Sequence, residues 1–264
     1  MSASSKYPKA NVLGVGIDAV SMDQTLERIE EELSSSRKGY VCFAGVHGVM
    51  EAQRSPELRR ILVSAVLVVP DGMPTVWVGR CQGNTSMQRV FGPDLMLEVL
   101  QRAEFQHLTH FLCGGKIGVA QELRERLQVR FPHIKVVGTY TPPFGPMSPA
   151  EGSEFIGMVG ELRPDIVWVG MSTPKQEHFM AQYLPSLDTR LMFGVGAAFD
   201  YHTGRISDCA GWIKRCGLQW LHRLLQDPRH LWKRYLRNNP AFIFAIALQL
   251  TRLRAYPLPP QSPA

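Results

Sequence analysis

Short apolar runs alternate with stretches of helical periodicity along most of this chain, and most runs end in glycine, proline or alanine. Valine, isoleucine and aromatic residues dominate the runs, as pleated strands favour. Strands that alternate with helices form parallel sheets, because each helix returns the chain to the same edge of the sheet. The predicted strands are 11–17, 40–44, 65–69, 109–113, 134–138, 165–170 and 190–196. The predicted helices are 25–33, 48–52, 56–63, 95–104, 118–130, 150–162 and 174–183.

This rhythm predicts an α/β protein with a Rossmann-like parallel sheet, whose ligands bind outside the carboxyl ends of the strands. The alternation stops after Phe199, where a helical pattern rich in tryptophan and arginine begins. The sequence thus divides into consecutive segments. These are a disordered leader (1–10), an N-terminal α/β lobe (11–106), a Rossmann-like lobe (107–200) and a basic helical appendage with a proline-rich tail (201–264).

The N-terminus is polar and lacks the apolar stretch of a secretory signal, and no window reaches the roughly 20 apolar residues of a spanning helix. The five cysteines are scattered and odd in number, and the histidines form no HExxH or similar pattern. We therefore expect reduced thiols in the cytosol and no metal site. The cysteines are Cys42, Cys81, Cys113, Cys209 and Cys216.

Residues 205–254 hold ten lysines and arginines against two aspartates, so this segment carries more positive charge than the net +6 of the whole chain. Such a segment attracts phosphate groups of a nucleotide, a nucleic acid or an anionic lipid. A solvated helix face is the plainer alternative. Aromatic residues interleave with the arginines, and the apolar run 241–248 favours an anionic membrane surface over nucleic acid.

Asp71 stands directly after the apolar run 65–69, between Pro70 and Gly72. Proline cannot continue a strand ladder and glycine permits a sharp turn, so the carboxylate is predicted at a strand tip. A turn-forming or helix-capping role is the alternative. A second such turn places Arg89 and Asp94 on either side of a Gly-Pro pair.

Two further strand ends carry candidate binding residues. Gly114 and Gly115 open a turn whose small residues could cradle a phosphate, although the P-loop and GxGxxG spacings are absent and a plain strand-to-helix turn is equally compatible. Gln176 and Glu177 follow Pro174 at the start of a predicted helix, where an amide and a carboxylate could bind sugar hydroxyls. The alternative for Glu177 is to complement the helix dipole.

Several motifs in this order resemble the WecG/TagA/CpsF family of bacterial glycosyltransferases (glycosyltransferase family 26), over residues 11–244. The motifs are 70–72, 89–96, 174–177, 194–200 and 217–229. The resemblance implies a core of the GT-E type with a C-terminal appendage that closes the active site and touches the membrane.

The resemblance also implies inverting transfer, without a metal or cofactor, from a UDP-sugar to a sugar on undecaprenyl diphosphate. It places the protein peripherally on the cytoplasmic face of the inner membrane and allows a homo-oligomer. Within the family, Asp71 matches the proposed base, Arg89 an arginine of the site and Gln176 a sugar-contacting glutamine. Arg223, His230 and Lys233 fall where relatives place arginines near the diphosphate.

The chain departs from the family at the end of the second strand, where many relatives have Thr-x-Asn and this chain has Phe43, Ala44 and Gly45. His47 is the expected substitute for the missing amide. His230 in place of arginine implies weaker, pH-sensitive diphosphate binding. This context favours glucose as the sugar, as in xanthan-type enzymes of the family. The alternatives are N-acetylmannosamine and N-acetylmannosaminuronic acid.

Two rivals come from other classes. A nucleotide-binding oxidoreductase fits the Rossmann-like wiring, but GxGxxG and a following acidic residue are missing. A non-enzymatic module that binds lipid or nucleic acid through residues 205–254 fits the charge, and salt-dependent binding without UDP affinity would favour it.

Overall fold

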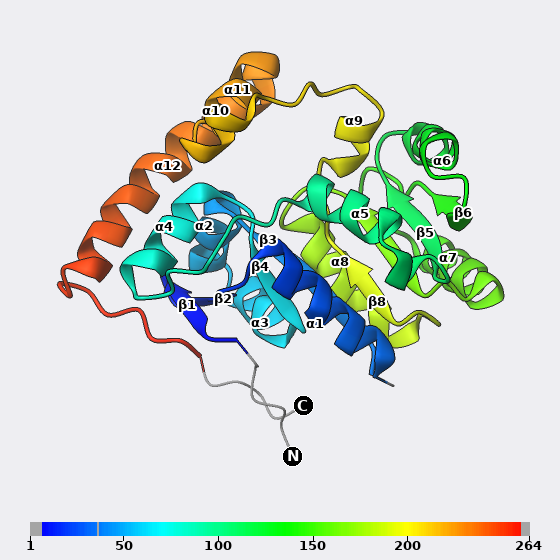
Figure 1. Ribbon diagram of the computed structural model, residues 1–264, viewed down its shortest axis with the longest axis horizontal. Helices are drawn as coiled ribbons and strands as arrows, with labels where there is room; N and C mark the ends of the chain where they lie inside the picture. Colours follow the sequence, from blue (N-terminus) through cyan, green and yellow to red (C-terminus); the bar gives the residue numbers. More distant parts are fainter. Residues whose placement is uncertain (1–6, 36, 260–264) are drawn as a thin grey trace. The chain divides into compact units, whose positions relative to one another are not determined.

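The computed structural model describes residues 7–35 and 37–259, in which strands and helices alternate (Figure 1). The strands are β1 (Lys9–Val12), β2 (Val15–Asp18), β3 (Gly39–Ala44), β4 (Leu67–Pro70), β5 (Thr109–Gly114), β6 (Lys135–Tyr140), β7 (Ile166–Gly170) and β8 (Leu191–Phe193).

The α-helices are α1 (Met22–Ser34), α2 (Val46–Arg54), α3 (Pro56–Ser64), α4 (Met73–Cys81), α5 (Gly92–Gln101), α6 (Val119–Arg130), α7 (Pro149–Leu162), α8 (Lys175–Tyr183), α9 (Ala198–His202), α10 (Gly211–Arg215), α11 (Gln219–Gln226) and α12 (Pro228–Leu250). Short 3-10 helices, η1 (Ala103–Phe105) and η2 (Leu184–Ser186), follow α5 and α8.

Within the described residues, six strands form one parallel sheet in the order β4-β3-β8-β7-β5-β6. This confirms the predicted Rossmann-like α/β class, with helices at the C-terminal end. The chain packs as two compact units. Unit 1 contains the described parts of Met1–Thr25, Phe43–Phe91 and Asp208–Ala264, and unit 2 contains those of Leu26–Cys42 and Gly92–Ser207. The predicted division into 11–106, 107–200 and 201–264 is consecutive, whereas both units are assembled from separate stretches.

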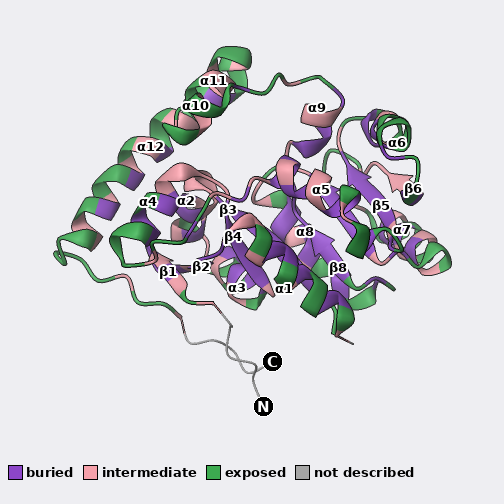
Figure 2. Ribbon diagram, viewed as in Figure 1, coloured by how far each residue is buried: buried purple, intermediate pink, exposed green. Residues whose placement is uncertain are grey.

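Unit 2 holds the strands β5, β7 and β8, which are almost wholly buried (Figure 2). Trp168 stacks on Phe193 with ring centroids 4.7 Å apart. Its indole N–H donates to Nδ1 of His110, 3.2 Å away, so neither polar group is buried without a partner. Burial lowers the pKa of His110 to about 4, which keeps the ring a neutral acceptor.

The predicted first strand, 11–17, is wrong. It is an antiparallel hairpin, β1 and β2, that forms its own sheet with Val12 opposite Val15. Leu13 and Gly14 make the turn with φ of 53° and 78°. Two positive φ values in a two-residue loop match the twist of the flanking strands. The side-chain oxygen of Asn11 accepts from the Gly14 N–H at 2.8 Å and fixes the turn.

The hairpin is tied to the rest of unit 1 at two places. The buried carboxylate of Asp18 accepts from the backbone N–H of Val68 in β4 at 2.8 Å. At the other end, the Gln249 amide of α12 accepts from the Leu13 N–H at 2.9 Å and donates to the Asn11 carbonyl at 2.8 Å. The end of the long C-terminal helix is therefore held by backbone groups near the start of the chain.

Helix α12, coloured orange to red in Figure 1, packs against α2. Leu231, Phe242 and Ile246 form its buried face. The opposite face is exposed although it is also apolar (Figure 2). This exposed stripe consists of Leu236, Pro240, Ile243, Phe244 and Ala247.

No described helix combines the length and the apolar character that crossing a bilayer requires. Of the predicted leader, residues 1–6 lie outside the described residues, whereas Lys9 and Ala10 already belong to β1. In the predicted proline-rich tail, residues 256–259 have no regular structure, and 260–264 lie outside the described residues.

Candidate active site

Asp71 follows the last residue of β4, as the sequence predicts. Its backbone N–H donates to the carbonyl of Ala44, at the end of the neighbouring strand, at 3.3 Å. The Val90 N–H donates to the Pro70 carbonyl at 2.8 Å and holds the other side of the loop. Gly72 then caps α4, so the half-buried carboxylate sits between a strand end and a helix start.

Gly45 lies beside this carboxylate. A side chain built on Gly45 would begin 3.7 Å from Oδ2 of Asp71, at ordinary contact distance. Many relatives are expected to have an amide at this position, and glycine instead leaves space next to the acid. Gly45 is also the N-cap of α2, whose first turn carries His47.

Arg89 brings a permanent positive charge to the Asp71 loop. Its Nε donates to the Asp71 backbone carbonyl at 3.2 Å, and its Nη2 donates to the side-chain carbonyl of Gln219 at the start of α11. The guanidinium carbon lies 4.2 Å from the ring centroid of Phe91, and Nζ of Lys214 lies 5.7 Å from the same ring. The C-terminal segment therefore holds Arg89 from one side and adds a second cation.

The remaining predicted cations of unit 1 lie on α11 and α12. Arg223 is half-buried, whereas His230 and Lys233 are exposed. Nδ1 of His230 lies 2.7 Å from a carboxylate oxygen of Asp227, the N-cap of α12. The hydrogen bond from His230 lowers the pKa of Asp227. Nζ of Lys233 lies 5.6 Å from the Trp232 ring centroid, so His230 and Lys233 each have a neighbour within α12 or its cap.

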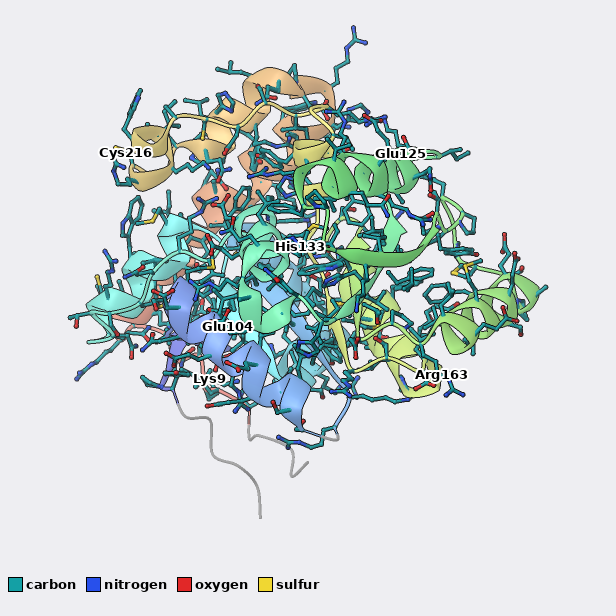
Figure 3. All side chains as sticks on the ribbon, turned by 45° about the vertical axis from the view of Figure 1, so that its right-hand side comes forward. Lys9, Glu104, Glu125, His133, Arg163 and Cys216 are labelled. Carbon is teal, nitrogen blue, oxygen red and sulfur yellow. The ribbon has the colours of Figure 1, made fainter. Side chains whose placement is uncertain are left out.

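The turn that joins α10 to α11 belongs to the same unit, and Figure 3 shows Cys216 at this turn. Gly217 follows with φ of 69°, and a side chain there would meet the Trp77 ring at 2.6 Å. Glycine is therefore required where the turn between α10 and α11 packs on the Trp77 ring of α4, within unit 1.

In unit 2, Gln176 is buried at the start of α8 and ties this helix to the loop after β8. Its Nε2 donates to the Gly194 carbonyl at 2.7 Å, and its Oε1 accepts from the Gly196 N–H at 2.9 Å. Both ends of the amide thus bind backbone. The predicted sugar contact stays a prediction, and the role that the structure displays is to shape the 194–196 loop.

Glu177 is 1% exposed. One carboxylate oxygen accepts from the Thr173 hydroxyl at 2.9 Å and from the Gln176 amide at 3.1 Å. The other has no hydrogen-bond partner among the described residues. Burial raises the pKa of this carboxyl, and burial together with the nearby Glu177 charge raises that of Cys42.

Gly114 and Gly115 lie at the end of β5 with φ of 130° and 74°. A side chain on Gly114 would meet the Gly170 carbonyl oxygen at 2.5 Å, and one on Gly115 would meet Val119 at 2.9 Å. Close packing therefore accounts for both glycines, which is consistent with the alternative of a plain strand-to-helix turn. The phosphate cradle stays a prediction. Asp94 lies in the first turn of α5, where its charge suits the helix dipole.

Sequence reasoning gave no role to Gln219 or Asn238. Gln219 lies inside the family motif 217–229, so the sequence already marks it as part of a functional segment. Asn238 is buried in a helix that is otherwise rich in basic residues. Its uncharged amide among arginines and lysines is the sequence feature that could have pointed to a structural role.

Comparison with known proteins assigns this α/β chain to the glycosyltransferases. The model of the glycosyl transferase WecG/TagA/CpsF family matches residues 10–256, so the chain belongs to that family, as the motifs predict.

Similar proteins include three named N-acetylglucosaminyldiphosphoundecaprenol N-acetyl-beta-D-mannosaminyltransferase. The protein from Bacillus spizizenii is 28% identical over 81% of this chain and 80% of its own length. The Bacillus subtilis protein is 26% identical over 75% of each chain. The Staphylococcus aureus protein is 26% identical over 92% of this chain and 94% of its own.

Proposed function

We propose that this glycosyltransferase moves N-acetylmannosamine from a UDP-sugar to a sugar carried on undecaprenyl diphosphate, with inversion and without a metal ion. The observation that carries the proposal is the Asp71 loop, where the residue that bears the strand-end carboxylate accepts, through its backbone carbonyl, a hydrogen bond from the guanidinium of Arg89. The names of the relatives favour N-acetylmannosamine over the glucose predicted from residues 43–45.

The reaction needs one base. A carboxylate oxygen of Asp71 takes the proton of the acceptor hydroxyl while the hydroxyl oxygen attacks the anomeric carbon of the donor. The bond from this carbon to the β-phosphate oxygen breaks, and UDP leaves with the electron pair. A single displacement inverts the anomeric centre. The relatives' names specify a β-linked product.

The departing diphosphate gains negative charge, which fixed cations stabilise best when they are held in place before reaction. Arg89 is held by the Asp71 carbonyl, Gln219 and the Phe91 ring. We assign it to the leaving group, with Arg223, His230 and Lys233 as further phosphate ligands from the C-terminal helices. Gly45 of unit 1 stays a predicted binding residue, as do Asp94, Gly114, Gly115, Gln176 and Glu177 of unit 2.

The lipid-linked acceptor requires the enzyme to work at a membrane. We propose that it binds the cytoplasmic face of the inner membrane peripherally, through α10–α12. The exposed stripe of α12 supplies apolar contact, and the arginines and lysines of 205–254 supply attraction to anionic lipid. A homo-oligomer stays a prediction from the resemblance.

The test is transfer to a short-chain polyprenyl-diphosphate-linked N-acetylglucosamine in separate reactions with UDP-N-acetylmannosamine, UDP-glucose and UDP-N-acetylmannosaminuronate. Product from the first donor alone supports the proposal. Product only from UDP-glucose reinstates the glucosyl assignment, and no product from any donor refutes the proposed function.

A further inference from the structure

A chain of polar side chains joins the C-terminal helix to the helix that starts beside Asp71. Asn238 of α12 is 2% exposed and lies between His47 and Arg54 of α2. Its Oδ1 accepts from Nη2 of Arg54 at 2.9 Å, and its Nδ2 lies 2.9 Å from Nδ1 of His47. Asn238 and His47 are 191 residues apart in the sequence, so only the packing of α12 on α2 creates the cluster.

The chemistry of the three groups fixes the proton on the imidazole. Arginine has donors only, so it must face the oxygen of the Asn238 amide. The amide nitrogen therefore faces His47 and donates. Nδ1 of His47 must be an unprotonated acceptor, which places the ring proton on Nε2.

Glu51 is the charged neighbour that could oppose this assignment. Its Oε1 lies 3.8 Å from Nδ1 of His47, beyond hydrogen-bond distance. The same oxygen lies 2.6 Å from Nη1 of Arg54. Glu51 is therefore engaged by the arginine, and Asn238 lies at hydrogen-bond distance from Nδ1.

The location of His47 near the Asp71 loop suggests what the Nε2–H group of this tautomer can bind. His47 lies two residues after Gly45, the N-cap of α2, and Gly45 adjoins the Asp71 carboxylate. The side chain of His47 is 26% exposed. It thus offers a polar group on the turn where relatives are expected to supply an amide.

We propose that Asn238 is a positioning residue that holds His47 in the Nε2–H tautomer, and that this N–H donates a hydrogen bond to an oxygen of the acceptor sugar beside Asp71. The inference rests on the proposed function. It gives the C-terminal helix a second task, because α12 then sets a donor at the sugar site as well as carrying the lipid-facing stripe. The competing explanation is that His47 and Asn238 only fasten α12 to α2.

The first experiment reads the tautomer without substrate, by ¹⁵N NMR of the histidine rings in the full chain at neutral pH, with His47 assigned from a His47→Gln spectrum. Wild type should show a protonated Nε2 and an unprotonated Nδ1. Asn238→Ala should give a mixture of tautomers. Asn238→Asp, which presents acceptor oxygens on both sides, should move the proton to Nδ1. Asn239→Ala, at the adjacent half-exposed asparagine, should keep the wild-type spectrum. A wild-type Nδ1–H or imidazolium overturns the inference.

The second experiment measures acceptor KM and kcat with the same polyprenyl-diphosphate-linked N-acetylglucosamine. His47→Ala and Asn238→Asp should each raise acceptor KM about tenfold, the effect of about 1.4 kcal/mol, and His47→Gln should restore most of the loss. Unchanged KM in both variants overturns the sugar contact and leaves only the fastening role. If wild type transfers no sugar, the proposed function fails, whereas the NMR result still decides the tautomer.

Discussion

Replacing Ile243 and Phe244 by serine removes two apolar side chains from the exposed stripe of α12. They are 68% and 67% exposed, and neither belongs to the face that packs on α2. Complete burial of such a side chain contributes about 1.5–3 kcal/mol, so transfer of the exposed two-thirds into lipid contributes about 1–2 kcal/mol each. The pair is then worth about 2–4 kcal/mol, and its loss should weaken membrane partitioning about 30- to 700-fold.

The assay is co-sedimentation with vesicles that contain phosphatidylglycerol, in low and high salt. The matched control replaces Ile117 and Val129, which are 95% and 84% exposed in unit 2, by serine. We expect the control to partition as wild type does. High salt should weaken the vesicle binding of wild type and control alike, because dissolved ions screen the attraction between the cations of 205–254 and anionic lipid. Equal partitioning of Ile243→Ser/Phe244→Ser and wild type would refute the membrane role of the stripe, as would an equal loss in the control.

Three further predictions concern single positions. Arg89→Lys keeps the charge but loses the planar fork that binds two partners, so kcat should fall about 10- to 100-fold in the transfer assay; a wild-type kcat would argue against a leaving-group role. The raised folded pKa of Glu177 means that wild type loses unfolding free energy as pH rises from the ordinary value of 4.5 through the folded pKa. Glu177→Gln should remove this decline in urea titrations at pH 5 and 7.5, and parallel curves would contradict it. Gly114→Ala puts a methyl group 2.5 Å from the Gly170 carbonyl oxygen and should cost about 3 kcal/mol or more, against about 1–2 kcal/mol for Gly118→Ala, where nothing lies within 4 Å; equal melting temperatures would disprove the packing explanation.

The strands of the parallel sheet were predictable because their signals are local. Apolar runs end in glycine or proline at Gly170 and Pro70, and the structure ends β7 and β4 at those residues. The hairpin turn at Leu13 and Gly14 was missed because 11–17 also fits a continuous apolar strand. Helix α4 was missed because the prolines and glycines near its start suggest a loop, although proline is well suited to a first helical turn.

The site was predictable only where its residues lie close together in the sequence, because only local signals can be followed along a chain. Asp71 and Arg89 lie within 18 residues of each other and in adjoining turns, so sequence places them together. The amide of Gln176 meets backbone groups 18 and 20 residues further along the chain, and a motif cannot show whether it faces a loop or a ligand. The Asn238 contact with His47 depends entirely on how two distant helices pack.

The central claim is that Asp71 is the base of the transfer, and the Asp71→Asn variant tests it most directly. Asparagine keeps the size of the side chain and cannot take the proton. We predict that kcat falls about 10²- to 10⁴-fold with UDP-N-acetylmannosamine and the lipid-linked acceptor, whereas the Kd for UDP stays within about twofold of wild type and EDTA leaves wild-type turnover unchanged. A kcat for Asp71→Asn within about threefold of wild type would contradict the account.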